Sequence, residues 1–187
     1  MTTDFQLQTS NNLSSIFAEK GLFTWAQLTD FVKHLPYGRN NNRTDFSLVI
    51  TENKGSCSSK HAFLKHAADL NNLPNIKLIL GIYKMNALNT PKIGNVLIDN
   101  NLDYMPEAHC YLSVAGVYED YTSRHANFNH IKNDILLEQE IESYQVIEFK
   151  VDYHKAFIRS WIENENIPFN FDEIWKIREE CISNMSS

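Results

Sequence analysis

The sequence predicts a single α+β domain, in which a helix that begins at a cysteine packs on an antiparallel sheet. Helical patterns come first along the chain, a β-hairpin pattern lies in its middle, and two helical patterns close it. Elements of one type that cluster along the chain, instead of alternating, are typical of this class. With 187 residues, 43% of them hydrophobic, the chain can form one core. We therefore expect one domain over residues 1–187.

The first predicted helix covers residues 24–35. Its apolar residues recur at spacings of three and four, which places them on one helical face. They are Trp25, Leu28, Phe31, Val32 and Leu35. Thr24 is a suitable N-cap, and Pro36 with Gly38 ends the helix. The β-prone residues 46–50 then predict a short strand, which leads into a polar loop over residues 51–56.

The central helix is predicted from Cys57 to about Leu73. Ser56 is a suitable N-cap, and Pro74 follows the end of the pattern. Its apolar face consists of Ala62, Phe63, Ala67 and Leu70. Residues 77–85 predict a buried strand, and residues 86–101 predict an irregular excursion.

A hairpin is predicted around the two-residue turn Ala115-Gly116, with strands over residues 109–114 and 117–122. Such a turn places His109 and Asp120 on the same face of the sheet, about 7 to 8 Å apart between backbones. An imidazole and a carboxylate can bridge that distance with a hydrogen bond. A turn longer by one residue would present Glu119 instead, so Glu119 is the alternative to Asp120.

The last third of the chain predicts a helix over residues 133–143 and a strand over residues 144–151. Two closing helices are predicted over residues 153–161 and 171–184. Trp25, Trp161 and Trp175 lie at helical spacing among other apolar residues, so we expect all three in the core.

Cys57 stands where a thiol is most reactive, because the positive end of a helix dipole favours the thiolate. Lys60, three residues later, adds a nearby cation. The backbone N–H of Cys57 is a candidate donor to an oxyanion, and the Asn53 amide is a second candidate. A cysteine that begins a helix is also commonly a plain core residue, so this feature alone leaves both interpretations open.

Other polar residues have a structural and a functional interpretation. Cys57, His61 and His109 would supply three zinc ligands, but no recognisable spacing supplies a fourth. His61 and His66 are expected on the helix surface or partly buried, whereas Cys110 and Cys181 are expected in the core. Glu107 is either a residue that lines a cleft or a solvated charge at a strand end. Residues 35–39, which include Arg39, form either a substrate-binding edge or a plain turn.

The stretch Gly55-Ser-Cys57-Ser-Ser-Lys60, followed by Ala108-His109 and by Asp120-Tyr-Thr122, resembles the core of the transglutaminase-like superfamily. That core has a cysteine opening a helix, a histidine beginning a strand and an aspartate on the next strand. The resemblance implies a papain-like fold and acyl transfer on amides, with Cys57 as nucleophile, His109 as base and Asp120 as orienting acid. The chain departs from the pattern in having Tyr121 where proline is common, and Cys110-Tyr111 after the histidine.

Composition restricts the partners. The chain has 17 Lys and Arg residues against 23 Asp and Glu, with no basic run, which argues against nucleic-acid binding. No apolar stretch is long enough for a membrane span, and the first residues lack the pattern of a secretory signal. Three cysteines without Cys-x-x-Cys spacing predict reduced thiols and a cytoplasmic location.

Two functions remain open from the sequence. The first is a cysteine-dependent acyl-transfer enzyme that acts on a peptide, protein or small amide through a thioester. The alternative is a catalytically idle transglutaminase-like domain that binds a peptide or protein partner in the same cleft. Neither a cofactor nor a metal is implied, because no calcium loop or phosphate-cradling glycine loop is present. The oligomeric state is left open.

Overall fold

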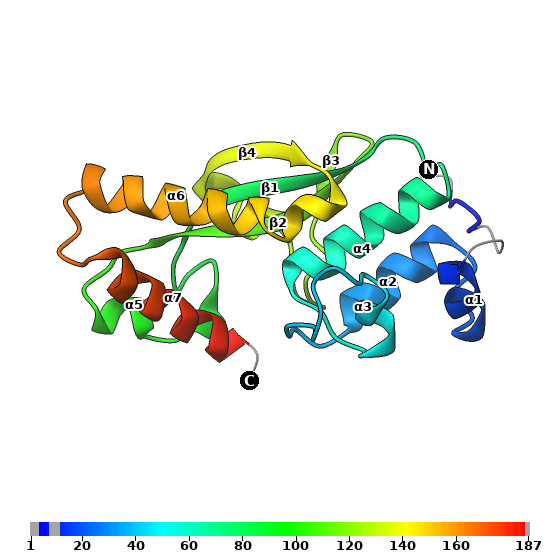
Figure 1. Ribbon diagram of the computed structural model, residues 1–187, viewed down its shortest axis with the longest axis horizontal. Helices are drawn as coiled ribbons and strands as arrows, with labels where there is room; N and C mark the ends of the chain where they lie inside the picture. Colours follow the sequence, from blue (N-terminus) through cyan, green and yellow to red (C-terminus); the bar gives the residue numbers. More distant parts are fainter. Residues whose placement is uncertain (1–3, 8–11, 186–187) are drawn as a thin grey trace.

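The computed structural model describes residues 4–7 and 12–185, and these residues form an α+β fold, as predicted. Its four-stranded antiparallel sheet has the strand order β3-β2-β1-β4. The strands are β1 (Ile76–Met85), β2 (Met105–Val114), β3 (Val117–Glu119) and β4 (Ile135–Ile141). In Figure 1 helices α1 to α4 gather at one end of the sheet, and α5 and α7 lie together near the other.

The helices are α1 (Asn12–Glu19), α2 (Trp25–His34), α3 (Leu48–Thr51), α4 (Cys57–Leu70), α5 (Val96–Asp99), α6 (Phe149–Asn164) and α7 (Phe171–Met185). Helices α2 and α4 begin where predicted, because both predicted caps are formed. The Thr24 side chain accepts a hydrogen bond from the Gln27 amide, and the Ser56 side chain accepts one from the Ser59 amide. No helix of the described residues combines the length and the apolar character that a membrane crossing requires.

The predicted hairpin and its register are confirmed. Ala115 and Gly116 have φ angles of 49° and 85°, as a tight two-residue turn between antiparallel strands requires. Val114 therefore pairs with Val117, and the paired part of β3 ends at Glu119. Asp120 is the first residue after that strand.

Two clusters of buried side chains use alternate residues of the sheet. Leu78, Leu80 and Ile82 of β1 pack with residues of α2 and α4. Ile79 and Tyr83 of the same strand pack with residues of α5, α6 and α7. Because successive residues of a strand point to opposite faces, the sheet separates the two clusters.

Three predicted elements were wrong. Residues 46–50 do not form a strand, because the Asp45 carboxylate accepts hydrogen bonds from the amide and hydroxyl of Ser47 and turns the chain into α3. Residues 133–143 hold β4 instead of a helix, since pairing with β1 overrides the helix propensity of leucine and glutamate. Residues 144–151 hold the end of the 3-10 turn η4 (Ser143–Val146) and the start of α6.

Candidate active site

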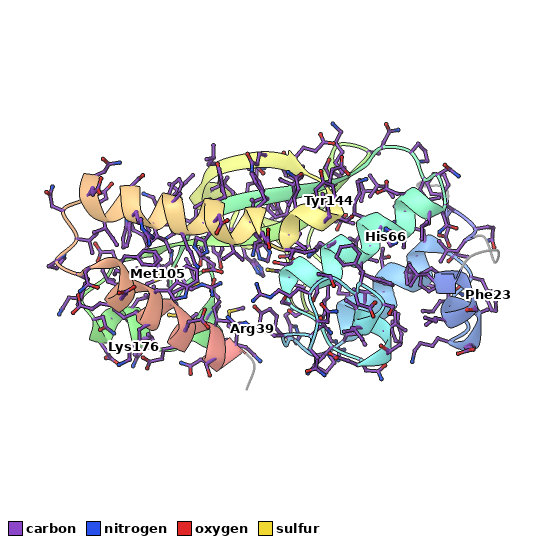
Figure 2. The ribbon with its side chains drawn as sticks, in the orientation of Figure 1. Phe23, Arg39, His66, Met105, Tyr144 and Lys176 are labelled. Atoms are coloured by element: carbon purple, nitrogen blue, oxygen red, sulfur yellow. The ribbon has the colours of Figure 1, made fainter. Side chains whose placement is uncertain are left out.

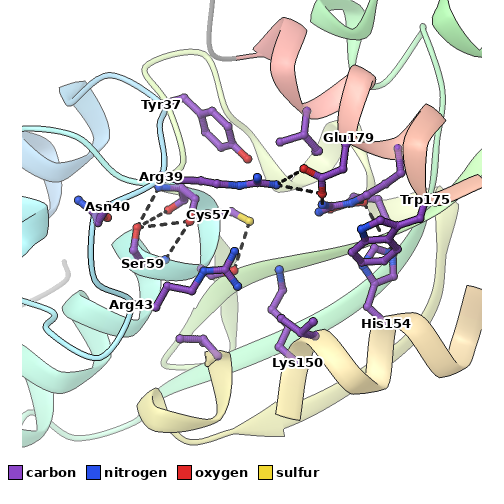
Figure 3. Close-up of a pocket in the computed structure, with 17 residues that line it drawn as sticks. Tyr37, Arg39, Asn40, Arg43, Cys57, Ser59, Lys150, His154, Trp175 and Glu179 are labelled. Atoms are coloured by element: carbon purple, nitrogen blue, oxygen red, sulfur yellow. Dashed lines mark hydrogen bonds and ion pairs between the residues drawn. The ribbon is translucent and has the colours of Figure 1, made fainter. Parts of the chain in front are cut away.

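A cleft of about 330 Å³ opens between the start of α4 and helix α7, and Cys57 lies in its wall. Figure 2 shows Arg39 between the half of the molecule that contains α4 and the half that contains α7. Figure 3 shows that many of the side chains facing the start of α4 come from the loop before α3 and from helices α6 and α7. The predicted nucleophile is therefore next to a space that can hold a small substrate or one or two residues of a larger one.

The chain reaches Cys57 through a close approach at Gly55. A Cβ atom on Gly55 would lie 2.7 Å from the Lys60 Cγ atom and 3.0 Å from the Ser59 hydroxyl oxygen. Only glycine leaves room for Lys60 to pass beside the loop and for Ser59 to bond the Ser56 amide at 2.9 Å. The result is a tightly turned entry that places Cys57 at the first position of α4.

His109 and Asp120 are joined by the predicted hydrogen bond. The His109 Nε2 atom lies 2.8 Å from an Asp120 carboxylate oxygen, and the Thr122 amide donates to the other oxygen at 2.9 Å. Nε2 is thereby occupied, so Nδ1 is the ring nitrogen left for the thiol. Glu119, the alternative acid, ends β3 opposite Leu112. Of the two candidate acids, Asp120 is the one that contacts His109.

The charges around Cys57 favour a thiolate. Burial raises the pKa of this thiol, but the Lys150 ammonium, followed by the charge and hydrogen bond of His109, more than offsets burial and lowers the pKa to about 6. Burial lowers the pKa of His109, but Asp120 and then the Cys57 thiolate raise it to about 10. The pKa of Asp120 falls well below its usual range despite burial, because of His109. At neutral pH the three groups are thiolate, imidazolium and carboxylate.

His61 is fully buried, which corrects the prediction of a surface or partly buried residue. Its Nδ1 donates to the Cys57 carbonyl and its Nε2 accepts from the Tyr121 amide, each at 2.8 Å. Burial lowers its pKa to about 4, so the neutral ring forms no ion pair with Asp120, 3.7 Å away. His61 therefore joins the residue that carries the thiol to the loop that carries the acid.

The zinc alternative does not fit this arrangement, because both ring nitrogens of His61 already bond the backbone. Within residues 4–7 and 12–185, no three His, Cys, Asp or Glu side chains are placed to hold a metal ion.

Lys60 also joins the two parts of the site. Its buried ammonium donates to the Leu35 carbonyl at 2.6 Å and to the Thr122 carbonyl at 2.7 Å. Burial lowers its pKa to about 8 against the opposite effects of Asp120 and Cys57. The predicted cation near Cys57 is present, and its hydrogen bonds hold the segment that follows Asp120.

The opposite wall of the cleft contains a buried ion-pair network. Arg178 of α7 makes a bidentate pair with Glu107 of β2, at 2.9 and 2.6 Å. Arg178 also pairs with Glu179, which in turn binds Arg39 at 2.8 Å. Burial raises the pKa of Glu107, but Arg178, His154 and Lys150 together lower it to about 2. Glu107 is therefore a buried, paired cleft residue and not a solvated charge.

One further prediction was wrong, one was confirmed in part, and two were confirmed. Asn53 is exposed, accepts a hydrogen bond from Lys20 at 3.4 Å and does not line the cleft, so it cannot serve as the oxyanion donor. Trp175, predicted in the core, is half-buried: it packs against the second cluster of buried side chains and also lines the cleft. Cys110 and Cys181 are buried, as expected.

The cations that face the thiol were not predicted from the sequence. Arg43 and Lys150 line the cleft, from a loop before α3 and from the first turn of α6. Neither belongs to a motif, and they are more than a hundred residues apart, so no local pattern could have linked them to Cys57. Tyr37 was contained in the segment predicted as a possible substrate-binding edge, and its side chain does line the cleft.

Comparisons with known proteins give no relative from which a role could be transferred. No protein-family model, no curated protein and no solved structure matches the chain. The resemblance to the transglutaminase-like superfamily therefore rests on the residues of this chain alone.

Proposed function

We propose that the protein is a cysteine-dependent acyl-transfer enzyme of the transglutaminase-like type, which acts on an amide of a peptide, a protein or a small molecule. One observation carries the proposal: a cysteine with a pKa of about 6 lies in a cleft wall and interacts with a histidine that is hydrogen-bonded to a buried aspartate. In a thiolate–imidazolium pair, the thiolate is the nucleophile and the imidazolium already carries the proton that the leaving group needs.

In the first half of the proposed reaction, the Cys57 thiolate attacks the carbonyl carbon and forms a C–S bond, while the C=O π electrons move to the oxygen. The Cys57 backbone N–H, at the positive end of α4, is the candidate donor to this oxyanion. The Tyr37 hydroxyl is a second candidate, because burial raises its pKa well above the usual range and keeps it protonated. Collapse breaks the C–N bond, and the leaving nitrogen takes the proton of His109.

In the second half, neutral His109 accepts a proton from the water or amine that attacks the thioester. The C–S bond then breaks, the acyl group leaves with the acceptor, and the thiolate and imidazolium are restored. Asp120 stabilises the imidazolium and fixes the ring orientation in both halves without taking the proton. No cofactor enters this scheme.

An activated ester tests the proposal without knowledge of the natural substrate. With p-nitrophenyl acetate, we expect a burst of about one p-nitrophenolate per chain and an acetyl group on Cys57, located by peptide mass spectrometry. Cys57→Ala should abolish the burst, whereas the matched variant Cys110→Ala should retain it. A native protein that gives neither burst nor adduct would exclude the enzyme and favour the idle binding domain.

A further inference from the structure

The cations that face Cys57 indicate which substrates the cleft accepts. We infer that Lys150 and Arg43 form a binding site for a carboxylate of the substrate, close to the carbonyl group that the thiolate attacks. This inference rests on the proposed function and adds to it the chemical class of the substrate.

Lys150 is the first argument for this site. Its side chain is nearly buried, with a residue exposure of 8%, and it forms no hydrogen bond or ion pair with any described residue. Figure 3 shows it extending from α6 into the cleft toward the sulfur of Cys57. Buried cations are normally paired, because removal of an ammonium from water costs several kcal/mol. A ligand in the cleft is the partner that this site lacks.

Arg43 supplies a second donor on the same side of the thiol. Its side chain lines the cleft, and among the described residues it too makes no hydrogen bond or ion pair. Figure 3 shows its guanidinium group directed into the cleft, toward Lys150. The planar fork of a guanidinium matches the two oxygens of a carboxylate, while an ammonium adds a point charge. The pair can therefore both attract and orient such a group.

The cleft carboxylates cannot neutralise these two cations. Glu107 is occupied by Arg178, and Glu179 is occupied by Arg178 and Arg39. The Cys57 thiolate and the Asp120 carboxylate are balanced by the His109 imidazolium and the buried Lys60 ammonium. Two positive charges thus remain in a cleft of a chain whose formal net charge is −6. Such a local field attracts anions to a surface that otherwise repels them.

Among amide substrates, the anion of this size is a carboxylate, either on an acidic side chain or at a chain end. In the alternative, Lys150 only stabilises the thiolate and Arg43 takes no part in recognition. The ratio of the rate constants of an anionic and a neutral reagent of the same shape would then be the same at Cys57 as at a free thiol. This difference separates a binding site from a mere effect on the thiol pKa.

Iodoacetate and iodoacetamide provide the test. Each is attacked at its CH2 carbon by the thiolate, which forms a C–S bond and expels iodide, but only iodoacetate carries a carboxylate. The measured quantity is the ratio of their rate constants at Cys57, divided by the same ratio for glutathione. The thiolate fraction cancels in this quotient, so a change in thiol pKa does not alter it.

We expect a quotient of about ten for the native protein, and a fall of roughly fivefold in Arg43→Gln and in Lys150→Gln, as loss of one ordinary hydrogen bond implies. Arg124→Gln is the matched control, because Arg124 is exposed, has the same charge and does not line the cleft. This control should keep the native quotient. Raising the salt concentration should lower the quotient through screening.

A quotient near one for the native protein, or one that Arg43→Gln leaves unchanged, would overturn the carboxylate site while leaving the proposed enzyme intact. Slow labelling by iodoacetamide itself, with the pKa of a free thiol, would instead overturn the proposed function. Because Arg43 is exposed, its substitution leaves the core packing unaltered and keeps the test decisive even if Lys150→Gln does not fold.

Discussion

Cys57 and Cys110 lie in neighbouring parts of the molecule, and both are buried, with residue exposures of 8% and 0%. Burial raises the pKa of either thiol. Nevertheless the pKa of Cys57 falls to about 6, whereas that of Cys110 rises to about 12. The surroundings at the start of α4 thus lower the pKa of a cysteine thiol, whereas those at the middle of β2 raise it.

The difference arises from His109 and from the signs of the other charges. Lys150 lowers the pKa of both thiols. His109 acts on Cys57 by its charge and by a hydrogen bond, whereas the thiolate of Cys57 raises the pKa of Cys110. A cation near a buried cysteine is therefore insufficient for activation here, and the histidine decides which of the two thiols ionises.

The largest expected effect is the difference in alkylation between these two thiols in the native protein. At about pH 7 we expect iodoacetamide to label Cys57 at least about 1000-fold faster than Cys110, because only Cys57 is largely thiolate. Peptide mass spectrometry over a time course measures both rates. Urea should abolish the selectivity by exposing both residues, and equal labelling of the two in the folded protein would refute the comparison.

His109→Ala should remove most of that selectivity. Without the imidazolium, the Cys57 pKa should return toward the ordinary value of about 8.5, so that labelling at about pH 6 falls roughly 100-fold. His66→Ala is the matched control, because His66 is a half-buried histidine of α4, the helix that Cys57 begins, and does not line the cleft. If both variants were labelled like the native protein, another group would have to stabilise the thiolate.

Asp120→Asn should have a smaller effect, of about tenfold at low pH, because the ring keeps a hydrogen-bond partner but loses a negative charge. In the native protein the ion pair forms as the pH rises through the Cys57 pKa of about 6, and it persists until His109 loses its proton at about 10. Labelling should therefore rise through about pH 6 to a plateau. Loss of the Asp120 charge lowers the pKa of His109 and moves the rise to higher pH.

The neighbouring Glu119→Gln variant is the control for Asp120→Asn, since it removes a negative charge at the adjacent position. Glu119 ends β3 and does not contact His109, so the rise in labelling should stay near pH 6. A shift in Glu119→Gln equal to that in Asp120→Asn would show that a general charge effect, and not the Asp120 hydrogen bond, sets the thiol pKa.

Local signals predicted the core of the site. The N-caps at Thr24 and Ser56 and the turn at Ala115-Gly116 are determined by neighbouring residues, and each was found in the structure. The two-residue turn fixes the strand register, and the register places Asp120 beside His109. The α+β class and the spatial relation of His109 and Asp120 followed from these short-range rules.

The parts that depend on distant contacts could not be predicted. The segment of β4 reads as a helix by propensity and becomes a strand only through pairing with β1. His61 has the spacing of a helix-surface residue, but it is buried by the Tyr121 loop sixty positions away. Lys150 faces Cys57 from α6, a helix that begins four residues before its predicted start.

The smallest expected effect on the thiol comes from Lys60→Met. This substitution removes a link between α4 and the Asp120 loop but leaves the charge of His109, the hydrogen-bond partner of the thiol, in place. We expect the labelling rate on the plateau to change less than about threefold. Stability should change more, because the Leu35 and Thr122 carbonyls lose their buried donor, at a cost of about 2 kcal/mol in the free energy of unfolding. The control Lys65→Met breaks only the surface pair with Asp69, worth about 0.5 kcal/mol.

The pH dependence of that stability difference identifies Lys60 as its source. The ordinary pKa of a lysine side chain is 10.5, whereas that of Lys60 in the folded protein is about 8, so between these pH values the unfolded chain binds more protons. Native stability should therefore rise as the pH increases from about 8 to about 10.5, and Lys60→Met should lack this rise. Urea unfolding at several pH values measures the free energy of unfolding of both proteins. If the difference between the two values stayed constant over this pH range, Lys60 would not be the buried cation that links the nucleophile helix to the acid loop.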